Sequence, residues 1–285
     1  MVRERAPAKL NLYLHVVGRR ADGYHLLDSL VAFADIADAL TAAPGDGLSL
    51  EVAGPFAAAL AGPVEDNLVW RAAAGLARRL GRAPDAALRL IKNLPVASGI
   101  GGGSSDAAAA LRALAALWQA PADPAMLADL AAALGADVPV CLAGRASWVA
   151  GIGEAVTPAP PLPQVAVVLA NPGAPLATAA VFKHRTGPFG MPARFAAAPR
   201  DARHLASLLR ARQNDLTDAA VALVPAIGTV LERLAAQEGA LIARMSGSGA
   251  TCFSLFAAPD AAAAAAAQLR ADHPGWWVAA GRLLA

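Results

Sequence analysis

The sequence predicts an α+β protein built from two domains. Segments with strand and helix patterns are mixed along the 285 residues, without the strict strand–helix–strand alternation of a doubly wound sheet. A hydrophobic fraction of 56% and a charged fraction of 16% are typical of an ordered, folded chain. The proline-rich segment 158–163 is the clearest linker. It divides the chain into an N-terminal domain, residues 1–157, and a C-terminal domain, residues 164–285.

The charge balance and the cysteines exclude several classes of function. Lys and Arg number 24 against 22 Asp and Glu, so no large field would draw the protein to nucleic acid or to an anionic membrane. Cys141 and Cys252 lie far apart without zinc spacing, and we expect free, buried thiols in a reducing compartment. No signal peptide pattern is found, and no apolar segment reaches the roughly 18 residues of a membrane helix. We therefore expect a cytoplasmic protein with no metal site of its own.

The N-terminal domain opens on a strand over residues 9–17. Apolar residues at 10, 12, 14 and 16 share one face, and the other face is polar, so the pattern predicts a half-buried strand. The polar face carries Lys9, Asn11, Tyr13 and His15. Further strands are expected at 47–53, 86–94 and 145–150. The expected helices are 66–80, 105–119 and 124–134.

The C-terminal domain begins with a buried strand at 165–170 and contains a long loop at 186–202. Helices are expected at 203–212, 217–237 and 260–271. Segments 240–246 and 251–257 flank a short turn of glycine and serine, which predicts a pair of strands, and a last strand is expected at 276–283.

The most informative segment is the glycine-rich loop Gly99–Ser105, which precedes an alanine-rich helix. Glycines let a backbone approach a ligand closely, and the first turn of a helix offers free N–H groups and a positive dipole end. Together these features predict an anion site of the phosphate-binding type. The segment has neither the lysine of the G-x-x-x-x-G-K-[ST] loop nor the spacing of G-x-G-x-x-G. The alternative is a flexible linker with a serine helix cap.

Four segments resemble motifs of the GHMP kinases, the superfamily of galactokinase, homoserine kinase, mevalonate kinase and phosphomevalonate kinase. Pro95–Ala108 is similar to the family's phosphate loop. Pro7–His25, Gly135–Cys141 and Met245–Phe253 resemble its first motif, its aspartate motif and its third motif, in family order. The resemblance implies an N-terminal domain like domain 2 of ribosomal protein S5 and a ferredoxin-like C-terminal domain.

The first motif is the most specific of the four. Its run Gly18–His25 (GRRADGYH) is similar to the branch of the family that acts on a cytidine-diphosphate-linked methylerythritol. This resemblance implies ATP-dependent phosphorylation of the 2-hydroxyl of 4-(cytidine 5'-diphospho)-2-C-methyl-D-erythritol in the non-mevalonate pathway of isoprenoid biosynthesis. ATP would be the co-substrate, with Mg²⁺ carried by its phosphates. No nucleic acid, membrane or obligate protein partner is expected.

The resemblance also implies roles for the polar residues of these motifs. Asp137 would orient and deprotonate the acceptor hydroxyl, and Lys9 would hold Asp137 ionised and stabilise developing charge. Asn11 would help to fix the substrate. By spacing alone, a turn aspartate and a solvated lysine are the simpler interpretations of Asp137 and Lys9.

The cytosine base would be held by Tyr24, which stacks on the ring, and by His25, which bonds its edge, while Phe182 and Lys183 close the other side. By residue pattern alone, Tyr24 and His25 are equally well an aromatic pair that packs at a domain edge. The resemblance places Asn67 near adenine, although an ordinary helix N-cap explains this residue equally well. The remaining residues expected at ATP are Pro95, Val96, Ala97, Ser98, Gly99, Ile100, Gly101, Gly102, Gly103, Ser104 and Ser105.

Two other functions remain open at this point. One is a GHMP kinase for a different small alcohol, and the other is a family member that binds a ligand without catalysis.

Overall fold

The computed structural model describes residues 1–120 and 123–284, which form two compact units. Unit 1 comprises residues 1–8, 37–96 and 101–144, and unit 2 comprises residues 9–36, 97–100 and 145–285. The long strands β1 (Val2–Arg19) and β2 (His25–Ala43) pair with each other and contribute to both units. Each unit combines separate segments of the chain, whereas the domains 1–157 and 164–285 expected from the sequence are consecutive segments. That division into consecutive domains stays a prediction.

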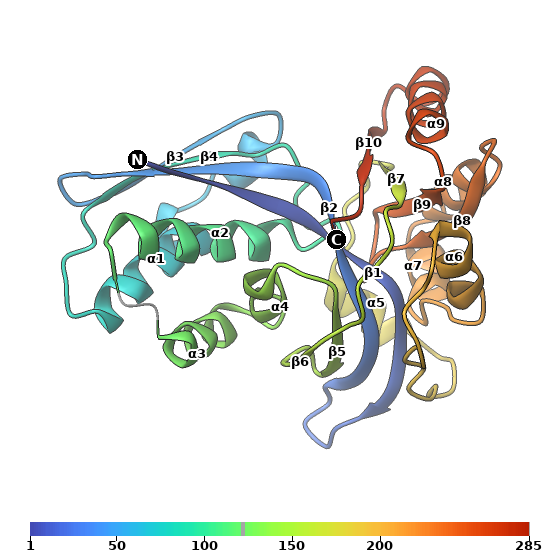
Figure 1. The fold of residues 1–285 in the computed structure, drawn as a ribbon, viewed down its shortest axis with the longest axis horizontal. Helices are drawn as coiled ribbons and strands as arrows, with labels where there is room; N and C mark the ends of the chain where they lie inside the picture. Colours follow the sequence, from blue (N-terminus) through green and yellow to red (C-terminus); the bar gives the residue numbers. More distant parts are fainter. Residues whose placement is uncertain (121–122, 285) are drawn as a thin grey trace. The chain divides into compact units, whose positions relative to one another are not determined.

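Unit 1 is a layer of strands covered by helices. Strand β4 (Ala86–Ile91) lies between β3 (Leu48–Ala53), which is parallel to it, and residues 39–43 of β2, which are antiparallel. Helices α1 (Leu68–Arg79) and α2 (Gly102–Leu117) lie side by side, and α3 (Pro124–Leu134) and α4 (Val138–Ala143) complete the unit (Figure 1). Short 3-10 turns at Ala57–Leu60 and Val64–Asp66 precede α1. Alanine and leucine side chains from α1, α2 and β4 fill the core.

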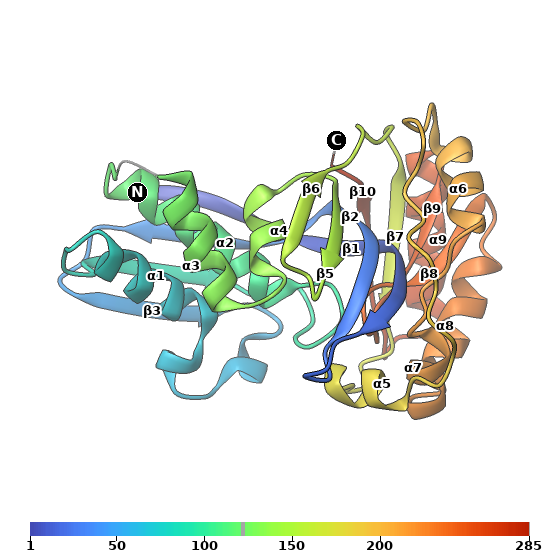
Figure 2. The ribbon, with the colours of Figure 1, turned by 90° about the horizontal axis from the view of Figure 1, so that it is seen from below.

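Unit 2 contains a four-stranded antiparallel sheet in the order β10-β7-β9-β8. These strands are β7 (Ala166–Asn171), β8 (Ala240–Met245), β9 (Cys252–Phe256) and β10 (Trp277–Arg282). In chain order the arrangement is 4-1-3-2, which is that of a ferredoxin-like domain and agrees with the predicted fold. Helices α8 (Ala226–Ala235) and α9 (Pro259–Asp272) pack along the sheet (Figure 2).

The remaining elements of unit 2 lie outside this sheet. Strand β5 (Ser147–Gly151) pairs with residues 27–31 of β2 and with β6 (Ala155–Pro158). Helices α5 (Thr178–His184), α6 (Ala202–Arg210) and α7 (Thr217–Leu223) connect β7 to α8. Every helix in the described part of the chain falls short of the length and apolar character that a membrane span requires.

Most expected elements are confirmed, and the exceptions have physical causes. Strand β2 was missed because residues 28–34 are buried on both faces, so the sequence shows no alternation there. The elements α4, α5 and β6 are too short to show a period. The single helix expected at 217–237 is wrong: α7 ends at Leu223 and α8 begins at Ala226, because Pro225 lacks the N–H that would continue the helix.

The strand expected at 9–17 is confirmed as part of β1, but the prediction that only one of its faces is buried is wrong. The polar face of β1 is as buried as its apolar face, with Lys9 only 4% and Tyr13 0% exposed. Polar side chains are buried at little cost when they bond to one another. The polar face of β1 is therefore internal to the fold.

Candidate active site

The glycine-rich loop and the residues that lead into it form the segment 95–105, whose two ends, 95–96 and 101–105, belong to unit 1. Gly101 adopts a left-handed conformation (φ 62°) as the N-cap of α2, and the Ser105 N–H bonds to its carbonyl at 2.8 Å. The N–H groups of the first turn therefore have no partner within the helix, which is the arrangement that binds anions. Asn67 is the N-cap of α1, where its side chain accepts a hydrogen bond from Val69 N at 2.9 Å.

A buried ion cluster fastens both ends of this loop. Lys92, at the end of β4, donates to the Asp38 carboxylate and to Asp106 Oδ2, the latter at 2.7 Å. Asp38 Oδ1 accepts hydrogen bonds from Asn93 N at 2.5 Å and Leu94 N at 2.8 Å. Asp38 thus holds the residues that enter the loop, and Asp106 belongs to the helix that leaves it. All three charged side chains are at most 3% exposed.

The charges in this cluster shift one another's protonation. Burial raises the pKa of Asp106 to about 7; repulsion by Asp38 adds to that shift and attraction by Lys92 opposes it. The two carboxylates raise the pKa of Lys92, against the effect of its own burial. The lysine therefore stays charged, and Asp106 changes protonation near neutral pH.

Asp137 stands at the start of α4 in the same unit. Its carbonyl accepts the Cys141 N–H at 3.2 Å. The helix is held at its other end by Arg112 of α2, which donates to the Cys141 carbonyl at 3.2 Å and to Glu4 at 2.9 Å. The Ser105 hydroxyl, predicted at ATP, donates to the Pro7 carbonyl at 2.7 Å and ties α2 to β1.

The middle of the loop, residues 97–100, belongs to unit 2, where neutral hydrogen bonds hold it. The Ser98 carbonyl accepts from Thr251 N at 3.0 Å, and the Ile100 carbonyl accepts from Lys9 N at 2.9 Å. The Ser246 hydroxyl donates to the Gly99 carbonyl at 3.0 Å. Gly99 has φ 78°, and a Cβ there would lie 2.5 Å from the Ser246 carbonyl oxygen, so the position requires glycine.

Lys9 and Asn11 lie on β1 within a buried polar network of the same unit. Lys9 Nζ donates to Asn11 Oδ1 at 3.0 Å, and Asn11 Nδ2 donates to the Ser29 hydroxyl at 2.8 Å. The Asn11 backbone N–H donates to Ser246 Oγ at 3.1 Å. Ser246 therefore bridges β1 and the glycine-rich loop.

Arg244, just before the third motif, fixes that motif to β1. Its guanidinium donates to the carbonyls of Leu12 at 2.7 Å, Leu209 at 2.9 Å and Arg212 at 2.6 Å. Burial, with repulsion by Arg212, lowers the pKa of Arg244 to about 10, so the side chain is charged at neutral pH.

The residues expected at the cytosine base come together in unit 2. The rings of His25, at the start of β2, and Phe182, on α5, are stacked with centroids 5.1 Å apart. Tyr24, which directly precedes His25 in the chain, is 61% exposed. Lys183, which directly follows Phe182 on α5, is also exposed. Burial, together with repulsion by Arg19 and Arg185, lowers the pKa of His25, so its imidazole is neutral at pH 7.

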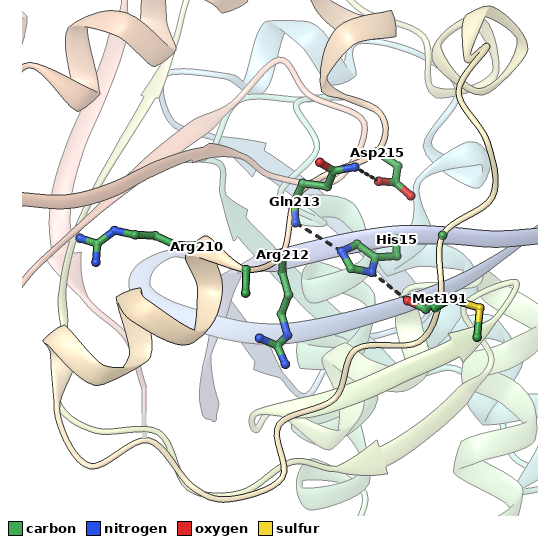
Figure 3. Close-up of a pocket in the computed structure, with 8 residues that line it drawn as sticks. His15, Met191, Arg210, Arg212, Gln213 and Asp215 are labelled. Atoms are coloured by element: carbon green, nitrogen blue, oxygen red, sulfur yellow. Dashed lines mark hydrogen bonds between the residues drawn. The ribbon is translucent and has the colours of Figure 1, made fainter.

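An open pocket of about 330 Å³ is lined by His15, a further residue of the polar face of β1 (Figure 3). Gln213 N donates to His15 Nε2 at 3.3 Å, so Nδ1 carries the proton and donates to the Met191 carbonyl at 3.0 Å. Asp215 accepts from Val16 N at 2.8 Å and from the Gln213 side chain at 2.8 Å. The His15–Met191 bond holds the 186–202 loop, which is confirmed as a loop, against β1, and the other bonds hold the segment 213–215 there.

The structure thus groups the predicted site residues by unit. Unit 2 brings Lys9 and Asn11 to the middle of the glycine-rich loop, and it stacks His25 on Phe182. Unit 1 carries Asn67, residues 101–105 and Asp137. The N-cap interpretation of Asn67 is observed. The assignments of these residues to ATP, substrate and catalysis stay predictions, as does the action of Lys9 on Asp137.

Several residues that shape the site could not be identified from the sequence pattern. Ser29, Asp38, Lys92 and Arg244 were not singled out, because each contacts partners far away in the chain. One signal was available: Lys92 is a charged residue directly after the apolar run of β4, and a charged residue in such a place tends to be buried only with a partner. The two cysteines are buried and neither forms a disulfide, as expected.

Comparison with known proteins identifies the family. The chain matches the N-terminal domain of GHMP kinases over residues 67–145 and their C-terminal domain over residues 195–275. Together with the fold and the glycine-rich loop, these matches define the class: the chain belongs to the GHMP kinases, which are ATP-dependent kinases.

The relatives narrow the family further. The chain is 54% identical to a protein of Paramagnetospirillum magneticum named 4-diphosphocytidyl-2-C-methyl-D-erythritol kinase, over 98% of this chain and 97% of the relative. A protein of Cereibacter sphaeroides with the same name is 56% identical over 98% of both chains. A crystal structure of 4-(cytidine 5'-diphospho)-2C-methyl-D-erythritol kinase superposes with a TM-score of 0.81 at 37% identity, covering both chains completely.

Proposed function

We propose that this GHMP kinase transfers the γ-phosphoryl group of ATP to the 2-hydroxyl of 4-(cytidine 5'-diphospho)-2-C-methyl-D-erythritol. The observation that carries the proposal is the Gly18–His25 run, whose last residue stacks on Phe182. The names of the relatives that share more than half of their residues with this chain agree with it.

The stacked pair suits a cytosine base. A neutral imidazole has one donor and one acceptor, so His25 matches the edge of cytosine, which presents an amino group and ring acceptors. Tyr24 is exposed and free to stack on the base, which contributes about 1–3 kcal/mol per stacked face. Lys183 and Phe182, adjacent on α5, would close the other side.

The transfer needs a base, positive charge and an anion site. The 2-hydroxyl oxygen attacks the γ-phosphorus, its proton passes to Asp137, and the bond from the γ-phosphorus to the bridging oxygen of ADP breaks. Lys9 would supply positive charge to the phosphoryl oxygens, and Asn11 would hold the substrate. Because Asp137 stands at the start of a helix anchored by Arg112, its position is well defined.

ATP would bind at the residues that start α2 and at the loop before it. The first-turn N–H groups of α2 and the backbone of residues 95–101 would receive the phosphates, with Asn67 near adenine. The described residues contain no group of three His, Cys, Asp or Glu side chains that could hold a metal ion. Mg²⁺ would therefore be held mainly by the phosphates, whose charge it neutralises when bound.

The cysteines and the substrate indicate the compartment and the partners of the enzyme. Two buried cysteines that form no disulfide favour a reducing compartment, and we place the enzyme in the cytoplasm. A small soluble substrate requires neither a membrane nor a nucleic acid, and we expect no obligate protein partner.

The Asp137→Ala variant tests the proposed chemistry. We expect the variant to bind ATP normally and to lose turnover by about 10²- to 10⁴-fold, because a general base contributes about that much. ADP release in a coupled assay measures turnover, and equilibrium dialysis with labelled ATP measures binding. Asp129→Ala, which removes an exposed carboxylate from α3, is the matched control.

The two alternative functions give different results in the same assay. A kinase for another alcohol would consume ATP with homoserine or mevalonate, and CDP would not compete with that acceptor. A ligand-binding family member would bind ATP and turn over no acceptor. A nearly normal rate in the Asp137→Ala variant would remove Asp137 from its role.

A further inference from the structure

The hydroxyl of Ser29 lies at the polar face of β1, where it both donates and accepts a hydrogen bond. Ser29 is on β2 and is 1% exposed. Its Oγ donates to the Tyr13 carbonyl at 2.5 Å and accepts from Asn11 Nδ2 at 2.8 Å. Asn11 in turn accepts from Lys9 Nζ at 3.0 Å. The chain of bonds thus runs from the lysine through the amide and the hydroxyl to a backbone carbonyl.

The direction of each bond in this chain is forced. A serine hydroxyl has one proton, and a backbone carbonyl has only lone pairs, so the Ser29 proton must go to Tyr13. Ser29 can then only accept from Asn11, which must present its NH₂ group. The other end of the amide, Oδ1, is therefore left facing Lys9, whose ammonium group has only donors.

We propose that Ser29 is a positioning residue for phosphoryl transfer, because it fixes the amide of Asn11 and thereby holds the Lys9 ammonium group in place. The proposal rests on the proposed role of Lys9 in the reaction. Ser29 touches neither substrate nor phosphate; it acts through Asn11 only.

Removal of the hydroxyl has a specific consequence. Asn11 is 5% exposed, so an NH₂ group that loses Ser29 has no water to replace it. Lys9 still needs an acceptor and keeps Oδ1 facing it, but the amide has lost the bond that fixes its other end. The amide and the ammonium group bonded to it can then shift together out of position. Displacement of a catalytic group by about 1 Å can cost on the order of 100-fold in rate.

The test compares Ser29→Ala with three other variants. Ser29→Thr keeps the hydroxyl, and Ser29→Cys keeps the volume in case the alanine variant folds poorly. Ser254→Ala is the control, because Ser254 is equally buried in a strand of the same unit and its Oγ has no hydrogen-bond partner among the described residues. Each variant is assayed for kcat and for the KM values of ATP and of the cytidine substrate, at temperatures well below its melting point.

We expect Ser29→Ala and Ser29→Cys to lower kcat by about 10- to 100-fold, with the KM of ATP changed less than about twofold. Ser29→Thr restores kcat to within about threefold of the wild-type value, and Ser254→Ala leaves it unchanged. The double variant Ser29→Ala/Asn11→Ala is no slower than Asn11→Ala alone, because the serine acts through the amide. A wild-type kcat in Ser29→Ala, or additive losses in the double variant, would overturn the proposal.

A second readout does not depend on the reaction. The side-chain amide protons of Asn11, identified in NMR spectra by their loss in Asn11→Ala, should exchange slowly in the wild type and in Ser29→Thr, and rapidly in Ser29→Ala. If the wild type does not phosphorylate the cytidine substrate, the proposed function fails, while slow exchange still shows that Ser29 holds Asn11. Equal exchange in all variants would contradict the positioning of the amide by Ser29.

Discussion

The two ends of the glycine-rich loop and its middle are held by different forces. At the ends, in unit 1, Lys92 joins two buried carboxylates, Asp38 and Asp106. In the middle, in unit 2, Ser98, Gly99 and Ile100 are held through their carbonyls, which accept hydrogen bonds from neutral groups. The ends of the loop are held in place by buried charges, and its middle is held by the close approach of backbone to backbone.

This difference determines what each part of the loop tolerates. A buried charge is stable only with its partner, so the ends should respond to a change of charge and to pH. Neutral hydrogen bonds do not titrate in this range, but they require close packing. The middle should therefore respond to added volume and be indifferent to pH.

The largest effect is expected for Lys92→Met. The substitution leaves two carboxylates buried beside each other without a cation, which destabilises a protein by about 3–5 kcal/mol. Urea denaturation gives the free energy of unfolding. The control is Arg89→Met on the same strand, because the Arg89–Glu51 pair is exposed and contributes at most about 1 kcal/mol. Equal, small losses in both variants would show that the cluster does not stabilise the loop ends.

The next effect is expected for Gly99→Ala in the middle of the loop. The new Cβ would lie 2.5 Å from the Ser246 carbonyl oxygen and 2.6 Å from that of Gly249, so the backbone must move. We expect a loss of about 1–3 kcal/mol in stability and of roughly 100-fold in turnover.

The matched control for that variant is Gly47→Ala. Gly47 has a similar φ of 83°, but no atom lies within 4 Å of its added Cβ. It therefore measures the cost of the left-handed conformation alone, about 1 kcal/mol. If the two variants behave alike in stability and in turnover, close approach is not what Gly99 provides.

The effect of a single pH unit is smaller still, and it is expected only at the ends. Burial raises the pKa of Asp106 to about 7 from an ordinary value of 3.8, so the folded state binds this proton more tightly than the unfolded state. Its contribution to stability is full below about pH 4 and is lost as the pH rises through about 7. The slope is at most about 1.4 kcal/mol per pH unit.

The Asp106→Asn variant should remove this slope. The quantity to compare is the difference in unfolding free energy between wild type and variant at several pH values, since contributions of other groups cancel in it. Asp129→Asn, at an exposed position, should keep the wild-type slope. A pH-independent difference for Asp106→Asn would show that Asp106 does not titrate in this range.

The sequence predicts the fold well where periodicity is strong and less well elsewhere. The helix expected at 105–119 is observed as α2, which begins three residues earlier at Gly102, and the paired strands β8 and β9 follow directly from the pattern. Strand β2 has both faces buried and so shows no alternation, and an apolar run without alternation does not by itself distinguish a strand from a helix. The break at Pro225 had a visible signal, because proline rarely continues a helix.

The site was predictable only as far as its residues are local. The anion-binding end of α2 follows from the glycines before it. The contact of Ser29 with Asn11, 18 residues apart, and that of Lys92 with Asp38, 54 residues apart, depend on strand pairing that the sequence does not specify. That His25 and Phe182 serve one base site was expected from the family resemblance alone, and their direct stacking on each other was not predicted.

The most direct test of the account is the position of the phosphate in the product. The purified protein is incubated with ATP and 4-(cytidine 5'-diphospho)-2-C-methyl-D-erythritol, and the product is examined by ³¹P NMR with proton decoupling switched on and off. We predict one new phosphate monoester per ADP released. In the predicted product the phosphate is attached to C2, which bears no proton. The ³¹P signal of this monoester should therefore show no coupling to a proton on the ester carbon. A monoester coupled to carbon-bound protons, or ATP consumption with homoserine or mevalonate and none with the cytidine substrate, would contradict it.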